Sequence, residues 1–499
     1  MVDTRVVKSE VNGVPCFSVD AGPPFFATLM FRVGHGDEPY LARGLSHFLE
    51  HLVLQSFRNA DQPFNGFVDM TTTSFHFGGE PSRLRDFFDR ICANLAAVPK
   101  DRIDVERGVL QSEANQRSVD GMSRLLRARY GYQGPGLGAA AEWGLRWLQA
   151  DRLSDWSARW FTRGNAALIV NGSMPSDVRL DLPEGPSPRS WSTKPLELAR
   201  PAVSVENAAG VVLGLQVPRG SYTNIIGLMV LREQMLERLR HETGQVYDVA
   251  LAYVRTSLKK SESALVISCE NDKAPRVARD AIEIVQRLGV DAPEQAMVDG
   301  VIALHRNQAE RDLKIDAAFQ HARSLLHGEK PPEDFEEIDR QIGQVTPDMV
   351  RDLHREALDS IIMLAPPTVD PADLGLVNLV PDGALPPQAG MTATWRGPGG
   401  WPGPGATLRR DDEAFAIVPQ QGDPVTVRLA DVVGRLIYRR FGNYIVSKTG
   451  VFVELWPGAW NDQGLVQYLD RNIDSSLWLE IDAPPLLPRP FSTKVPARY

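Results

Sequence analysis

The chain has 499 residues and a formal net charge of -9, with 43% hydrophobic and 23% charged residues. This length exceeds what one ordinary core organises, so we expect two to four domains in a folded, soluble protein. The acidic balance and the lack of a Lys/Arg run exclude the electrostatic footprint of a nucleic-acid or membrane-surface binder.

Cysteine usage and the first residues bear on the compartment. Cys16, Cys92 and Cys269 lie far apart, which argues against a disulfide framework and favours a reducing environment. The opening residues lack the apolar core of a secretory signal, and no apolar stretch is long enough to span a bilayer. We therefore expect a cytoplasmic protein.

Residues 1–185 have the pattern of an α+β domain. Alternating apolar and polar residues predict strands within residues 5–35, interrupted at Asn12-Gly13. The apolar periodicity then predicts a helix from Ala42 to Phe57 and a strand around residues 68–77. Further elements follow in order: helices at 83–98, 101–117 and 150–161, and a buried strand at 165–173.

A second α+β pattern covers residues 200–365 and suggests a duplicated domain, that is, two tandem α+β domains. It predicts strands at 210–217, 246–254, 263–270 and 361–366, a long helix at 228–242, and helices up to residue 358.

Residues 366–499 differ from the two preceding domains in composition and in predicted structure. Residues 366–406 are rich in Pro and Gly and read as a linker. Residues 407–480 predict a small, mostly β domain, vaguely like a pleckstrin-homology fold, with a closing helix at 463–473. The proline-rich tail at 481–499 predicts irregular structure.

The segment GLSHFLEHLVLQ carries the strongest functional signal. On a helix its apolar residues form one stripe, and His47, Glu50 and His51 fall on the opposite face. Two imidazoles four residues apart can bind one zinc ion, and Glu50 can reach a metal-activated water and take its proton as the water attacks a carbonyl. The ordinary alternative is a pair of surface histidines on an amphipathic helix, which the full HxxEH pattern disfavours.

A zinc site needs at least one further protein ligand. Glu113 is the candidate, and Glu106 lies seven residues earlier on the same face of a predicted helix. Taken alone, a carboxylate pair at this spacing is usually a solvated face.

Several segments together resemble the insulinase/pitrilysin family of inverted-motif zinc peptidases, in particular its processing-peptidase-like branch. In the first half these are FRVGHGDEPYLARGLSHFLEHLVLQ, FNGFVDMTTTSFHF, VERGVLQSE and RWFTRGNAALIVNGS; in the second half the segment is LERLRHETGQVYDVALAY. The resemblance covers residues 5 to about 365 and leaves the C-terminal part outside.

The resemblance implies a role for each matching residue. The implied zinc ligands, one ion per chain, are His47, His51 and Glu113. Glu50 would be the general base, and Glu106 would support the site. Asn65 would hold the substrate backbone. Arg240 and Tyr247 would contact substrate, with the Tyr247 hydroxyl stabilising the oxyanion.

The resemblance also implies an assembly. Four such domains close into a clamshell around a peptide bound as an added β-strand, and this chain supplies two of them. A homodimer, or a heterodimer with a related chain, is therefore expected. Two departures stand out: the stretch from His51 to Glu113 is shorter than usual, and Gly66 replaces a usual alanine, a change that we expect to be harmless.

The main hypothesis is thus a zinc endopeptidase that hydrolyses peptides or unfolded segments. The alternative is a non-cleaving subunit that binds polypeptide or scaffolds a partner, and a third is an adaptor based on the C-terminal β domain. Among the other polar residues, His35 and His76 are more readily core or surface histidines than ligands. Trp456 and Trp460 are more readily packing than a recognition surface.

Overall fold

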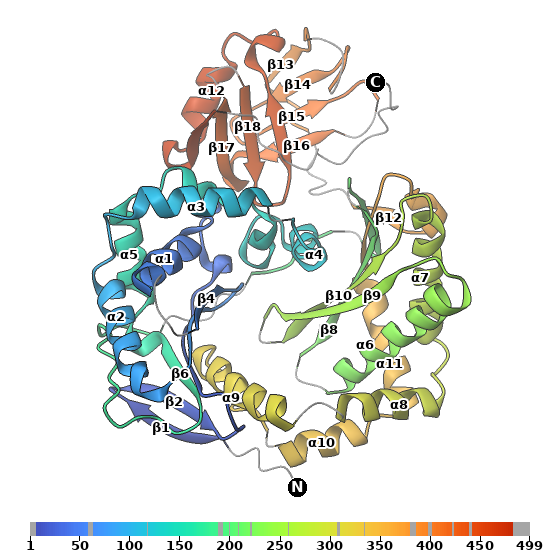
Figure 1. Ribbon diagram of the computed structural model, residues 1–499. Coiled ribbons are helices and arrows are strands. Elements are labelled where there is room, and N and C mark those ends of the chain that lie inside the picture. The colour runs from blue at the N-terminus through green and yellow to red at the C-terminus, as the bar shows by residue number, and fades with distance from the viewer. Residues whose placement is uncertain are drawn as a thin grey trace.

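The structure, a computed structural model, describes most of the chain in two facing halves and a C-terminal region (Figure 1). The described residues are 6–57, 63–116, 118–187, 193–198, 200–207, 209–219, 222–257, 259–306, 310–333, 335–379, 386–397, 402–421, 424–438 and 442–482. Among the helices of these residues, none combines the length and apolar character that crossing a bilayer requires. The fold is α+β throughout.

The first half is built on a six-stranded sheet in the order β1-β2-β6-β3-β5-β4. Its strands are β1 (Val7–Val11), β2 (Val14–Val19), β3 (Phe26–Phe31), β4 (Phe64–Val68), β5 (Thr73–Gly78) and β6 (Ala166–Asn171). The β2–β6 pair is parallel and the other pairs are antiparallel. One face carries a single large apolar core together with the helices α1 (Leu45–Leu54), α2 (Leu84–Ala96), α3 (Ile103–Gln116) and α5 (Ala150–Trp160).

The second half repeats this plan with the order β12-β7-β11-β8-β10-β9. Its strands are β7 (Ala202–Val205), β8 (Val211–Pro218), β9 (Asp248–Arg255), β10 (Lys260–Ser268), β11 (Ile362–Ala365) and β12 (Val377–Asn378). Its helices are α6 (Tyr222–Met235), α7 (Ala274–Leu288), α8 (Gln295–Arg306), α10 (Phe335–Gly343) and α11 (Pro347–Ala357). The core lies between the sheet and the α6, α7 and α11 layer.

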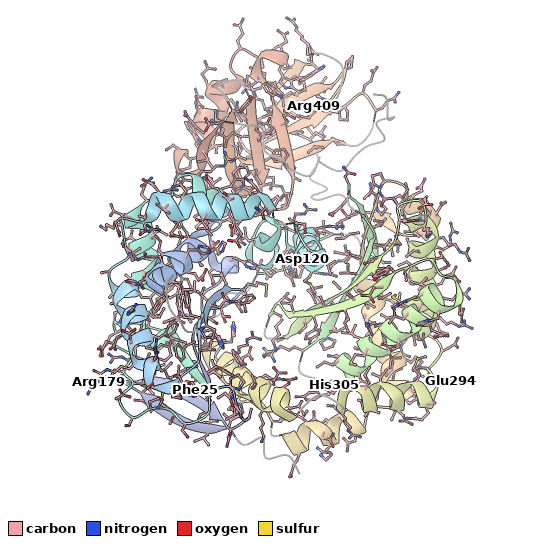
Figure 2. The ribbon with its side chains drawn as sticks, in the orientation of Figure 1. Phe25, Asp120, Arg179, Glu294, His305 and Arg409 are labelled. Carbon is pink, nitrogen blue, oxygen red and sulfur yellow. The ribbon has the colours of Figure 1, made fainter. Side chains whose placement is uncertain are left out.

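Each half lends one helix to the open face of the other half's sheet. Helix α4 (Gly121–Tyr130) packs Leu125 into an apolar cluster with strands of the second sheet. Helix α9 (Glu310–Leu326) packs Ala318 and Ala322 against β2 and β6 of the first sheet. Asp120, which caps α4 by accepting a hydrogen bond from the Ser123 N–H at 2.9 Å, lies between the two halves (Figure 2). The two sheets are therefore buried on both faces only in each other's presence.

The C-terminal region consists of two four-stranded sheets around one core. The first has β13 (Met391–Thr394), β14 (Thr407–Arg410), β15 (Ala414–Val418) and β16 (Val425–Arg428). The second has β17 (Val432–Tyr438), β18 (Gly442–Ser447), β19 (Phe452–Leu455) and β20 (Trp478–Ile481), and α12 (Leu465–Asn472) precedes β20. This region sits on the first half, near α3 and α4 (Figure 1).

The observed elements refine the sequence expectations in three places. The strand expected around residues 68–77 is the end of one strand and most of the next, because the Asp69 carboxylate accepts hydrogen bonds from the N–H groups of Thr71 and Thr72 and makes a turn. The long helix at 228–242 ends as a π-helix over Leu236–Glu242. Within 366–406, β12 pairs with the second sheet and β13 with the C-terminal region, while most of the tail at 481–499 lies outside the described residues.

Candidate metal centre

A buried carboxylate holds the start of α1. Free N–H groups at a helix start need acceptors, and Glu38 accepts from the Gly44 N–H at 2.8 Å and the Ser46 N–H at 2.7 Å. Arg43 Nη1 lies 3.2 Å from the same carboxylate. Burial raises the pKa of Glu38, and Arg43 and the two N–H groups oppose this rise. The chain before α1 is thereby tied to the helix that carries the motif.

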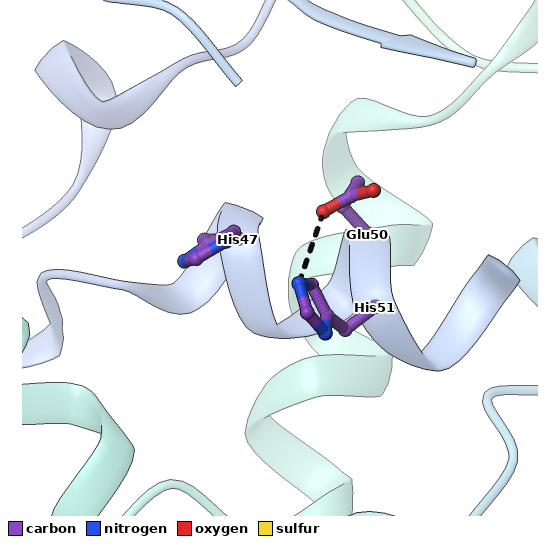
Figure 3. A group of neighbouring side chains, drawn as sticks. All are labelled: His47, Glu50 and His51. Atoms are coloured by element: carbon purple, nitrogen blue, oxygen red, sulfur yellow. Dashed lines mark ion pairs between the residues drawn. The ribbon is translucent and has the colours of Figure 1, made fainter. Parts of the chain in front are cut away.

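The motif residues gather on one side of α1 (Figure 3). Potential ligand atoms of His47, Glu50 and His51 lie within 4.8 Å of one another. The imidazole centroids are 4.9 Å apart, and Glu50 Oε2 is 3.8 Å from His51 Nε2. Helical spacing thus brings the three groups together, as the sequence predicts.

Glu113, on α3, reaches both imidazoles. Its Oε2 atom is 3.8 Å from His47 Nε2 and 3.7 Å from His51 Nε2. Around a tetrahedral zinc with ligand bonds of about 2.0–2.1 Å, ligand atoms are about 3.3–3.5 Å apart, so a small contraction would bring these three into range. Two imidazoles and one carboxylate are a donor set that zinc accepts. The short stretch between His51 and Glu113 does not carry this carboxylate away from the histidines.

Two further carboxylates face the other nitrogens of the imidazoles. Glu142 lies 3.2 Å from His47 Nδ1, and Glu106 lies 3.6 Å from His51 Nδ1. Both imidazoles therefore direct Nε2 toward Glu113, the arrangement in which a carboxylate sets the tautomer and orientation of a metal-binding histidine. Burial and His47 lower the pKa of His51, and the two glutamates Glu113 and Glu106 oppose this.

Glu142 is a site residue that the sequence analysis missed. It stands 95 residues from His47 and belongs to no recognisable motif. Arg43 also pairs with it, at 3.3 Å. A single glutamate in an irregular segment offers no periodic signal, so this contact becomes visible only once the chain is folded.

Gly66 on β4 leaves the space that Glu50 occupies. The Glu50 side chain is buried, and a Cβ atom built at Gly66 would lie 1.7 Å from Glu50 Oε1. An alanine at this position would therefore force the Glu50 carboxylate to move, whereas glycine leaves it in place. The Glu50 side chain therefore lies between its own helix, α1, and the outer strand β4.

Asn65 lies exposed on β4, the outer strand at this edge of the first sheet. Its side-chain oxygen accepts the N–H of Gly66 at 3.0 Å. A cavity of about 250 Å³ opens beside β4 and reaches under α9, whose residues Phe319 and Arg323 form one wall. The outer strand therefore borders both Glu50 and an open space.

Arg240 and Tyr247 belong to the second half. Arg240 is exposed in the π-helix that continues α6, and α6 lies across the molecule from α1 (Figure 1). Tyr247 is 83% exposed just before β9, and its N–H donates to the Ser268 carbonyl at 2.9 Å. The structure thus does not bring this pair to the histidine group within one chain.

The remaining polar candidates take structural positions. His76 shares a hydrogen bond of 2.9 Å with the Thr28 hydroxyl, and burial lowers the pKa of both His76 and His35. Trp460 is in the core of the C-terminal region, and Trp456 donates to the Glu454 carboxylate at 2.6 Å.

Solved protein structures resemble this fold, whereas searches by sequence find no match. No protein-family model matches the chain, and no curated protein matches it. A protease from Helicobacter pylori superposes with a TM-score of 0.60 at 14% identity, over 72% of this chain and 100% of that one. A peptidase M16 inactive domain from Pseudomonas fluorescens gives 0.59 at 13%, over 72% and 97%.

The periplasmic protease PqqL from Escherichia coli extends this likeness. Its first half gives a TM-score of 0.57 at 15% identity, over 74% of this chain and 93% of that one. The complete PqqL gives 0.59 at 13%, over 86% of this chain and 56% of that one. At these identities the likeness shows the fold: two tandem α+β units as in half of an M16 peptidase, the fold of the insulinase/pitrilysin group.

Proposed function

We propose that this protein is a zinc-dependent endopeptidase that hydrolyses peptides or unfolded segments. One observation carries the proposal: Glu113 lies within 3.8 Å of two imidazoles, each of which has its other nitrogen turned to a carboxylate, with Glu50 beside them. A merely solvated helix face has no reason to orient both rings toward one acceptor.

The roles follow from the contacts. His47, His51 and Glu113 would hold one zinc ion, which when bound supplies a Lewis acid that polarises a carbonyl and acidifies water. Glu50 would take the proton of the attacking water as general base and pass it to the leaving amine. Glu106 and Glu142 would keep the two imidazoles in the ligating tautomer.

Substrate would bind as an added strand at the outer edge of β4. An edge strand offers backbone groups to an extended peptide, and recognition of this kind depends on the main chain more than on side chains. Asn65 lies exposed on that strand, where it would hold the substrate backbone, and Phe67 is 63% exposed beside it.

The active unit would be a dimer. Arg240 and Tyr247 are exposed in the second half, across the molecule from α1, so a second copy, or a related chain, would bring such a pair to the histidine group. In that position Tyr247 would stabilise the oxyanion with its hydroxyl and Arg240 would bind substrate. Because the zinc residues and this pair occur in the same chain, a homodimer is sufficient.

Replacing the general base tests the function. We expect Glu50→Gln to retain about one zinc per chain and to lose about 10²- to 10⁴-fold in the hydrolysis of a peptide mixture followed by mass spectrometry. The matched variant Glu113→Ala should instead lose zinc. Equal cleavage by wild type and Glu50→Gln would overturn the proposal.

A non-cleaving subunit is the second candidate, supported by the likeness to the M16 inactive domain. In that case the wild-type protein would bind peptides and leave them intact even with zinc bound. The same mass-spectrometric assay on the zinc-loaded wild type separates the two functions.

A further inference from the structure

One face of the C-terminal sheet β19-β18-β17-β20 is buried against the first half. The cluster is apolar on both sides. It consists of Leu436, Tyr444, Val446, Phe452 and Ile481 from the C-terminal region, and Tyr40, Leu41, Tyr132, Leu137, Ala140 and Trp143 from the first half. An apolar interface of this kind favours a fixed arrangement of two regions, unlike the polar contacts between mobile domains.

The backbones also meet at this interface. The Tyr132 N–H donates to the Lys448 carbonyl at 2.9 Å. Gly131 has φ +69°, and a Cβ atom there would lie 2.0 Å from the same carbonyl oxygen. The turn at 447–450 is thus seated directly on the start of the segment 131–143.

That segment contains Glu142, whose carboxylate faces His47. Trp143 Nε1 donates to the Tyr40 hydroxyl at 3.1 Å, and Glu142 directly precedes this tryptophan. Arg43 donates from Nε to the Leu137 carbonyl at 3.1 Å and pairs through Nη1 with Glu142 at 3.3 Å. The residues on either side of the Glu142–His47 contact therefore rest on the C-terminal sheet.

We propose that the C-terminal β region sets the zinc affinity of the centre by holding Glu142 on Nδ1 of His47. Glu142 is a positioning residue, since it acts through His47. The identity of the metal rests on the proposed function; the support of His47 by a distant region is the new element. Loss of a carboxylate behind a ligating histidine weakens metal binding about 10- to 100-fold, which gives the C-terminal region a measurable handle on the site.

The test measures zinc dissociation constants of full-length variants by competition with a chromophoric chelator at fixed pH. We expect Glu142→Gln to bind zinc about 10- to 100-fold more weakly than wild type, and Leu436→Ala about threefold or more weakly. Leu436 is buried in the interface, and Leu288, buried in the second half's core, supplies the matched control. Leu288→Ala should keep the wild-type constant.

A double variant distinguishes positioning from general loosening. If the C-terminal region acts through Glu142, Leu436→Ala should add nothing to the zinc constant once Glu142→Gln is present. Additive effects would overturn the proposal, as would wild-type affinity in Glu142→Gln or equal weakening by Leu288→Ala. If Leu436→Ala does not fold, Leu436→Val is measured in its place with the same expectations. A wild-type protein that binds no zinc would refute the proposed function instead, so the two failures are distinguishable.

Discussion

The two halves of this molecule share one architecture and differ in what fills it. In each sheet, the fourth strand in the spatial order is followed along the chain by a helix: α1 follows β3, and α6 follows β8. This helix packs over the outer strands of its sheet, β5 and β4 in the first half and β9 in the second. Among the described residues, the one group of at least three His, Cys, Asp or Glu side chains that lie within metal-binding distance of one another is His47, Glu50 and His51 on α1, which Glu113 approaches from α3. Helix α6 instead buries Ile226, Leu228 and Leu231. The fold thus provides the frame, and the polar residues of one helix provide the chemistry.

The outer strands show the same contrast. On β4, Gly66 leaves room for the Glu50 carboxylate, whereas on β9 Leu251 packs against the core of the second half. The two exchanged helices differ as well. Both helices are held by apolar packing, but α4 adds the buried ion pair Arg129–Glu262, whereas α9 has the partly exposed Arg323 near Asp69 at its end. Each difference can be tested by changing one side of the comparison.

The largest effect on stability is expected at the ion pair between Arg129 and Glu262, which joins α4 to the second sheet. Arg129 Nε lies 2.7 Å from Glu262 Oε2, with both side chains at most 1% exposed. Glu262→Ala would leave a buried guanidinium unpaired and should lower the free energy of unfolding by about 3–5 kcal/mol, measured by urea denaturation. The double variant Arg129→Met with Glu262→Leu should recover most of this loss. An unchanged midpoint in the single variant would contradict the expectation.

A pH-dependent effect on stability is expected at His327, directly after α9, the helix that covers the first sheet. Burial, reinforced by Arg32, lowers the pKa of His327 to about 4. Between about pH 6.5 and pH 4 the unfolded chain therefore binds more protons at this residue than the folded chain, so stability falls as the pH falls through this window, by at most about 3 kcal/mol. His327→Gln should flatten the acid limb of a plot of stability against pH. An identical acid limb in both proteins would refute this.

The smallest effect is expected at the outer strands. Gly66→Ala should displace the Glu50 carboxylate and reduce peptide hydrolysis about 10- to 100-fold, equivalent to about 1.4–2.7 kcal/mol of barrier, with zinc content unchanged. Leu251→Ala, on the corresponding outer strand of the second sheet, should lower stability without this specific loss of rate. A crystal structure of Gly66→Ala with Glu50 in its original place would remove the explanation.

Local periodicity was enough to predict much of the molecule. Apolar spacing predicted most strands and helices of both halves, but not α4, β7 or β12. The helical period alone placed His47, Glu50 and His51 on one side of α1. The pairing of Glu113 with these histidines came from the family resemblance, because a helix pattern says which face is polar and not what lies opposite.

Long-range relations account for what the sequence did not reveal. The sequence patterns did not single out α4 or α9, and no local feature says that each packs on the other half's sheet. Glu142 and the seating of the C-terminal region on the segment 131–143 depend on contacts between distant parts of the chain, and the crowding at Gly66 depends on where one carboxylate comes to rest. Patterns within one element carry no information of this kind.

The exchange of α4 and α9 also bears on how the protein emerges from the ribosome. The first sheet is complete once β6 has been made, yet the helix that covers its open face is about 150 residues further along the chain. At about 5–20 residues per second, that apolar surface waits on the order of 10 to 30 s for its cover. The nascent first half therefore leaves this apolar face uncovered during synthesis, and a translation pause just before α9 would lengthen that exposure.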